Sequence, residues 1–365
     1  MLKFMTTLAL GVLLATAARA DDTPLPMSGV WTGTVGTFPV NVCLQVQSGD
    51  SFNFGGYYYL SHLKLISLQA GDKANAGKWT EGDDPDKPDA IWSIAMKGDD
   101  ISGSWAGNGK TLDVNLHRLA KLTGDDVDSP CGSGVFFNPR VSDPKIKETP
   151  STLDGQAYTK IEVDAGKQFD VSYETFQLKG SGEGVAKINK LLMPGGGKDY
   201  VECLQQAATM GRDGDYEVTN TPKILTPHWL VVEESDGSSC GGAHPVNSSD
   251  ETVYNPATGE TLDLTKWLAP GAIKDGMLQG KLNKLVQAKY AKGRSGDDDK
   301  ECVDAVKSPD GWSISLSKQG VVFLPALPYV AVACADPVEV GFNDVAPFLN
   351  AEGKKQLADF RSEVK

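Results

Sequence analysis

Histidine is scarce in this chain. Its 365 residues include only four histidines, and His62 and His117 have no partner at a metal-ligand spacing. Protein zinc sites are built largely from histidine and cysteine side chains at characteristic spacings. We therefore expect no metal site and no cofactor, and a zinc or iron enzyme is disfavoured.

Long apolar runs are missing after the first 20 residues. The run from Leu8 to Ala15 is shorter than the roughly 20 residues of a membrane-spanning helix, and it follows a basic start at Lys3. Ala18-Arg19-Ala20 then supplies the small residues of a cleavage site. The sequence predicts a signal peptide at residues 1–20 with cleavage after Ala20. It also predicts no membrane span in the mature chain, and a periplasmic or secreted protein.

Positive charge is in deficit. There are 35 lysines and arginines against 48 aspartates and glutamates, so the formal net charge is -13. Removal of the signal peptide would take away Lys3 and Arg19 and no acid. This balance argues against nucleic acid or an anionic membrane as a partner, and it permits attraction to a basic protein.

Cysteine is present in an even number, six, which in an exported protein predicts disulfides. Cys43 lies in the first predicted domain, Cys131 lies in the segment just after it, and four cysteines lie further on. Their positions favour three pairs, which are Cys43 with Cys131, Cys203 with Cys240, and Cys302 with Cys334.

Residues 27–120 consist of short runs that alternate with period two. In Val40–Val46 the aliphatic residues point to one face and Cys43 to the other. About eight such runs at near-regular spacing predict an all-β meander that closes into a barrel. Tyr57, Tyr58 and Tyr59 are consecutive, so at least one ring faces outward. We interpret Tyr58 as a candidate binding residue for sugar or protein.

Several glycine and aromatic runs in this region follow one another in a fixed order: Gly29-Val-Trp-Thr-Gly33, Gly55-Gly-Tyr-Tyr-Tyr59 and Ile101-Ser-Gly-Ser-Trp105. In that order the region resembles a small lipocalin-like barrel of exported bacterial proteins. The tryptophans are interpreted mainly as core. The alternative is a barrel that carries one small apolar ligand.

A proline-rich linker is predicted at residues 121–150, an α+β domain at 151–350 and a C-terminal tail at 351–365. Helical spacing predicts helices at 184–192, 198–210 and 273–292, and Asp297–Glu301 is interpreted as a loop. Hairpins are predicted around Asn255-Pro-Ala-Thr-Gly259 and Ser317-Lys-Gln-Gly320.

Three runs carry a second resemblance: Gly241-Gly-Ala-His244, Thr258-Gly-Glu-Thr-Leu-Asp-Leu264 and the strands from Trp312 to Ala333. With them the second domain resembles the extracytoplasmic domain of unknown function shared by lysozyme-sensing anti-sigma factors and some peptidoglycan deacetylases. The resemblance implies a non-enzymatic cell-envelope binding protein whose ligand is a lysozyme-type muramidase or peptidoglycan. Those deacetylases hold their catalytic metal in a separate domain, which this chain lacks.

Cys240 and His244 are the candidate reactive residues, because a thiolate near an imidazole is a known nucleophile arrangement. The alternative is a disulfide at Cys240 and a structural His244. Ser238 and Ser239 are further hydroxyls near His244. An envelope hydrolase acting on glycan or peptide is therefore kept as an alternative to the binding protein.

Overall fold

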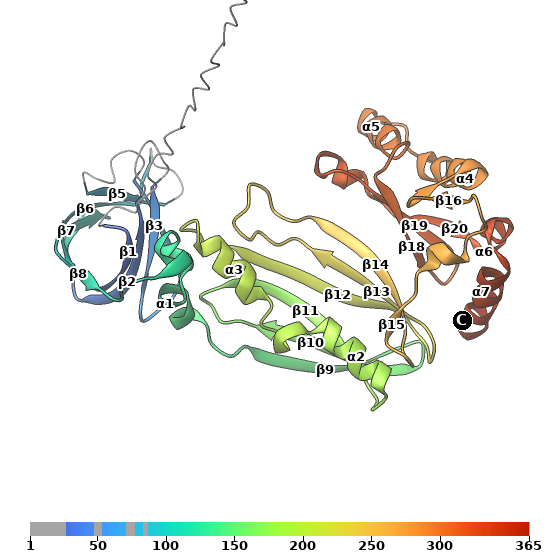
Figure 1. Cartoon of the computed structure of the whole chain (residues 1–365), viewed down its shortest axis with the longest axis horizontal. Helices are drawn as coiled ribbons and strands as arrows, with labels where there is room; N and C mark the ends of the chain where they lie inside the picture. The colour runs from blue at the N-terminus through green and yellow to red at the C-terminus, as the bar shows by residue number, and fades with distance from the viewer. Residues whose placement is uncertain (1–26, 47–52, 71–76, 83–86, 365) are drawn as a thin grey trace, which may run out of the picture.

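The computed structural model describes residues 27–46, 53–70, 77–82 and 87–364. The predicted signal peptide lies outside the described residues. Three parts follow one another along the long axis of the molecule: a barrel, a long sheet with two helices, and a C-terminal unit of helices and a small sheet (Figure 1). An all-β barrel is thus followed by an α+β region, as the sequence predicts.

The N-terminal part is a closed antiparallel barrel in which the eighth strand pairs with the first. Each strand pairs with the next in sequence, which is the meander expected from the alternating pattern. The strands are β1 (Gly29–Val35), β2 (Phe38–Gln45), β3 (Phe54–Tyr59), β4 (Ile66–Gln69), β5 (Lys78–Glu81), β6 (Ala90–Lys97), β7 (Asp100–Gly107) and β8 (Lys110–Arg118).

Aromatic side chains form much of the barrel core. Trp31, Trp79 and Trp92 are fully buried there, which confirms their interpretation as core residues. The Glu81 carboxylate lies among them. Its Oε1 accepts hydrogen bonds from Tyr57 Oη at 2.7 Å, Trp92 Nε1 at 2.7 Å and Trp105 Nε1 at 2.5 Å. Burial and the Glu81 carboxylate raise the pKa of Tyr57 far above its ordinary value. The Tyr57 hydroxyl therefore stays protonated and can donate to the buried carboxylate.

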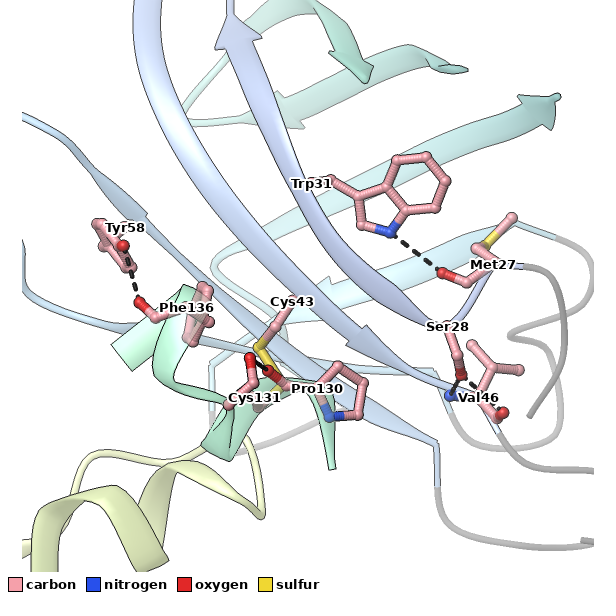
Figure 2. The surroundings of a disulfide bond; sticks show 10 residues. Met27, Ser28, Trp31, Cys43, Val46, Tyr58, Pro130, Cys131 and Phe136 are labelled. Carbon is pink, nitrogen blue, oxygen red and sulfur yellow. Dashed lines mark hydrogen bonds between the residues drawn. A yellow bond between two sulfur atoms is a disulfide. The ribbon is translucent and has the colours of Figure 1, made fainter. Parts of the chain in front are cut away.

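The outer face of β2 and β3 is covered by the segment that follows the barrel. Cys43 points outward and forms a disulfide with Cys131 (Figure 2). The Tyr58 hydroxyl donates to the Phe136 carbonyl at 2.9 Å, and Tyr58 is 0% exposed. The prediction of an exposed Tyr58 is therefore wrong. The Tyr58 ring does point out of the barrel interior, but the segment that follows the barrel covers it. The segment contains η2 (Gly124–Val127), η3 (Pro130–Gly132), α1 (Gly134–Phe137) and η4 (Asn138–Arg140).

Arg140 joins the barrel to the region that follows. It is 1% exposed, and its guanidinium donates to the Leu63 carbonyl at 2.8 Å and to Asp213 Oδ1 at 2.6 Å. The backbones also approach closely: a Cβ on Gly211 would lie 2.5 Å from the Gly55 carbonyl oxygen. The two parts are therefore packed against each other at this junction.

The middle part is a seven-stranded sheet in the order β15-β14-β13-β12-β11-β10-β9. Only β11 and β12 run parallel, and their connection carries two helices, α2 and α3, which confirm the predictions at 184–192 and 198–210. Residues 145–150, expected in the linker, belong to β9. Pro150 is tolerated there because β9 is an edge strand. The elements are β9 (Lys145–Leu153), β10 (Gln156–Asp164), β11 (Asp170–Leu178), α2 (Glu183–Leu192), η5 (Pro194–Gly196), α3 (Tyr200–Ala208), β12 (Asp215–Leu225), β13 (Leu230–Asp236), β14 (Ser248–Asn255) and β15 (Glu260–Thr261).

The C-terminal part has its own apolar core between a three-stranded sheet, β18-β19-β20, and the surrounding helices. Its β18–β19 hairpin confirms the predicted turn at Ser317–Gly320. The elements are η6 (Leu264–Trp267), β16 (Ile273–Lys274), β17 (Met277–Leu278), α4 (Gly280–Ala291), α5 (Asp297–Ala305), β18 (Gly311–Leu316), β19 (Gly320–Ala326), η7 (Tyr329–Cys334), β20 (Val338–Gly341), α6 (Phe342–Val345), η8 (Ala346–Phe348) and α7 (Ala351–Glu363).

Three sequence predictions fail in this part. The helix expected at 273–292 begins only at Gly280, because Asp275 and Gly276 have φ of 50° and 78° and form a tight hairpin turn. The loop expected at Asp297–Glu301 is the first half of α5. Residues 351–365, expected as a tail, contain α7, whose Phe360 is 0% exposed within the core.

Asn350 starts α7, and its removal gives a testable effect on stability. Asn350 Oδ1 accepts from the Gly353 amide at 2.8 Å, and its Nδ2 donates to the Lys266 and Leu268 carbonyls. We expect Asn350→Ala to lower the free energy of unfolding by about 1–2 kcal/mol. Asn350→Ser keeps a capping oxygen without placing a carboxylate against the Lys266 and Leu268 carbonyls, and it should lose less. Urea denaturation measures both variants, and equal losses would contradict the role of the cap.

Candidate functional site

Cys240 is not a free nucleophile in this structure. It forms a disulfide with Cys203, and all six cysteines are paired as the sequence predicts. The neighbouring Ser239 sits in a Gly237-Ser-Ser-Cys-Gly241 run whose spacing matches a nucleophile elbow. However, Ser239 pairs through its backbone with Asp215, and a loop follows it instead of a helix. The hydrolase alternative therefore loses its proposed thiol nucleophile.

His244 lies in the connection from β13 to β14 and stacks on Tyr329. The ring centroids are 4.6 Å apart and the planes differ by 29°. Tyr329 begins η7, a segment held to α5 by the disulfide between Cys302 and Cys334. The stack thus joins the long sheet to the C-terminal part, and Tyr329 is a residue that the sequence interpretation missed.

A groove opens beside this stack, between β14 on one side and β18, β19 and the η7 region on the other. It consists of two adjoining cavities of about 640 Å³ and 230 Å³. We call it the acidic groove. The residues that line both cavities are Ser249, Asp250, Ser313, Leu324 and Ala335.

The floor of the acidic groove is one face of the β18–β19 hairpin. Leu316 and Phe323 point to the other face and are buried in the C-terminal core. Because side chains alternate along a strand, Ser313 and Ser315 point to the groove, opposite Leu324 and Val322 in the register. The floor therefore combines serine hydroxyls with small apolar surfaces.

Four carboxylates line the narrow cavity: those of Glu233, Asp250, Glu251 and Asp336. Among the described residues that line either cavity there is no lysine or arginine. Two of the acids have basic partners outside the lining, because Lys223 pairs with Glu233 at 3.0 Å and Arg294 pairs with Asp336 at 2.5 Å. Asp250 and Glu251 make no such ion pair within the described chain, so the groove keeps a negative charge.

Burial and crowding act on the glutamates of this region. Burial raises the pKa of Glu251, and the nearby Glu233 and Asp250 carboxylates add to the rise, while the Ser315 hydroxyl and Lys223 oppose it. Like charges held this close favour a ligand that brings positive charge.

Two polar atoms at the narrow end lack partners of good hydrogen-bond geometry. Ser315 is 3% exposed, and neither its Oγ nor Glu251 Oε2 has such a partner. Buried polar atoms are nearly always hydrogen-bonded in folded proteins. The Ser315 hydroxyl lies close enough to Glu251 to lower its pKa, so a bound group would meet the two side chains together.

A second open cleft of about 680 Å³ lies between the β12–β13 turn and α7. There His228 Nδ1 is 2.6 Å from Glu363 Oε1. Burial would raise the pKa of Glu363, but hydrogen bonds from Thr226 and His228 lower it. The His228 side chain thus links the β12–β13 turn to the C-terminal helix.

Among the described residues, no three histidine, cysteine or acidic side chains come close enough to hold a metal ion. Within the same part of the chain, no helix has both the length and the apolar character needed to cross a membrane. The three disulfides fit an oxidising compartment and hence an extracellular or secreted protein.

No protein-family model matches this sequence, and no curated protein matches it. Several solved structures are similar to it, and two of them belong to the same family. A member of the DUF3298 family from Bacteroides fragilis has 11% identity and a TM-score of 0.39, covering 61% of this chain and 96% of its own. A DUF3298 family protein from Pseudomonas aeruginosa PAO1 has 13% identity and a TM-score of 0.37, covering 58% of this chain and 97% of its own. Neither similarity identifies an activity for this chain.

Proposed function

We propose that this chain is an exported binding protein of the cell envelope whose acidic groove recognises a basic protein of the lysozyme-type muramidase class. The observation that carries the proposal is the groove itself. It is lined by four carboxylates, and none of the described lining residues is basic. A binding role needs no nucleophile, which agrees with the disulfide at Cys240.

Electrostatics supports a basic partner over a neutral one. The chain has a net charge of -13, so its long-range field attracts cations and raises their association rate. The exposed Asp250 then provides a local target at the rim of the groove. The muramidase class itself comes from the resemblance of residues 240–268 and 312–349 to lysozyme-sensing domains.

Calorimetry of the mature protein with a basic lysozyme tests this function. We expect saturable binding at about 50 mM salt that weakens at about 300 mM, because salt screens exposed charges. The bound lysozyme should also lose lytic activity. No heat at either salt would contradict the proposal, and peptidoglycan fragments would then be the next ligand to test.

The pH dependence of this binding follows from the raised pKa of Glu251, which lines the narrow cavity. A carboxyl group is neutral below its pKa, so its attraction to a cation is present above the pKa and is lost as the pH falls through it. Because the pKa of Glu251 is raised, the affinity should already fall between about pH 7 and about pH 5.5, where an ordinary glutamate stays largely ionised. Calorimetry at the two pH values measures this fall, and an unchanged affinity would contradict it.

A further inference from the structure

The strand β14 has an unpaired edge along the acidic groove. It pairs with β13 from Ser248 to Tyr254, but with β15 only at Tyr254 and Asn255. Among the described residues, no strand pairs with the stretch Ser248–Thr252 on that side. An unpaired edge offers backbone N–H and C=O groups to another chain.

The register of the sheet shows which backbone groups face the groove. The Leu262 amide donates to the Val253 carbonyl at 2.8 Å, so the backbone of Val253 points away from β13. This direction repeats every second residue, which places the backbone groups of Ser249 and Glu251 on the same outer edge. The lining of the groove agrees with this direction. A cavity over one face of a sheet meets every second residue of a strand, whereas a cavity along its edge meets consecutive residues, and the groove is lined by residues 247–251.

Other observations show that the edge can be reached and has polar groups nearby. Ser248, Ser249 and Asp250 are exposed. The outward Glu251 amide is bonded only to the Asp250 side chain, at 2.8 Å, which an incoming strand can displace. The buried Ser315 hydroxyl lies beside the Glu251 carboxylate and lines the same cavity.

We propose that an extended polypeptide segment bearing lysine or arginine binds in the acidic groove by adding a strand to the β14 edge. This inference rests on the proposed function and specifies how the basic partner is held. Main-chain hydrogen bonds to Ser249 and Glu251 would supply the affinity, as in other cases of strand addition. Side chains on one face of the added strand meet the Glu251 carboxylate and the small apolar groups of the floor, such as Leu324, and those on the other face lie on the side of the Asp250 carboxylate.

The length of the edge sets the size of the bound segment. Residues 247–251 line the groove, and five extended residues span roughly 16 Å. A segment of about five or six residues therefore fills the groove. A segment in which basic and small apolar residues alternate matches the two sides of the groove.

The test uses a fluorescent six-residue peptide of alternating lysine and valine, titrated against the mature full-length protein. A matched peptide has the same sequence and charge, but alternate main-chain amides are N-methylated so that they cannot donate. Fluorescence anisotropy should show saturable binding of the first peptide and at least about tenfold weaker binding of the second. Equal affinities would overturn strand addition, because charge alone would then explain binding. No binding of either peptide would overturn it as well.

A substitution in the protein separates this inference from the proposed function. Ser249→Pro removes an outward N–H and leaves the charge unchanged, and proline is accepted on edge strands. We expect the Ser249→Pro variant to bind both the peptide and the basic lysozyme at least about tenfold more weakly. Its melting temperature should equal that of the unsubstituted protein. Undiminished lysozyme binding to Ser249→Pro would overturn strand addition and keep the proposed function. Peptide binding that discriminates against N-methylation, without any lysozyme binding, would support strand addition and reject the proposed partner.

Discussion

Replacing Arg140 with alanine should lower the free energy of unfolding by about 3–5 kcal/mol, the cost of breaking a buried ion pair from one side. The Arg140 guanidinium donates to Asp213 and to the Leu63 carbonyl, and it lies 4.9 Å from the Phe169 ring centroid. Without it, Asp213 keeps its partly buried charge and the Leu63 carbonyl loses this donor. Burial already raises the pKa of Asp213, and Arg140 opposes that rise.

Lys198→Ala is the matched control for this prediction. Lys198 also pairs with an aspartate, Asp143, at 2.5 Å, but both side chains are exposed, at 44% and 91%. An exposed pair contributes little, so the loss should stay below about 1 kcal/mol. Urea denaturation of both variants gives the comparison. Equal losses would show that Arg140 does not hold the barrel to the long sheet.

Removing the disulfide between Cys43 and Cys131 should lower the free energy of unfolding by about 4–5 kcal/mol. The two cysteines are 88 residues apart, and a cross-link over a longer loop restricts the unfolded chain more. The disulfide between Cys302 and Cys334 closes only 32 residues and should cost about 3–4 kcal/mol. Paired alanine variants, unfolded without reductant, measure both. A cost for the Cys43 and Cys131 pair below that of the shorter loop would contradict the chain-entropy argument.

The barrel was predictable because its signal is local. Alternation places Val42 inside and Cys43 outside, whatever the rest of the chain does. Tyr58 shows the limit of that argument. Alternation determines the face on which a side chain lies, but whether that face is covered depends on Phe136, which is 78 residues away.

The errors in the C-terminal part have local causes that other signals reveal. Asp275-Gly276 is a strong hairpin turn, but helical spacing on both sides concealed it. Asn350 is a capping residue, and such a residue indicates that a helix begins directly after it, where a tail is predicted. Both signals lie in residues at the ends of elements and not in hydrophobic periodicity.

The acidic groove was beyond the reach of sequence patterns. Its walls come from β13, β14, the β18–β19 hairpin and residues after η7, which lie far apart in the chain. The sequence did single out His244, but its partner Tyr329 is 85 positions further along the numbering. Only the packing of the C-terminal part against the open edge of the sheet brings these residues together.

The affinity of a charge-reversed groove tests the central claim most directly. Asp250→Lys changes an exposed groove carboxylate, and Glu148→Lys makes the same change on β9, the opposite edge of the same sheet. Calorimetry with a basic lysozyme should show about tenfold or greater weakening for Asp250→Lys and a much smaller effect for Glu148→Lys. Equal affinities for the two variants would show that the acidic groove is not the binding site.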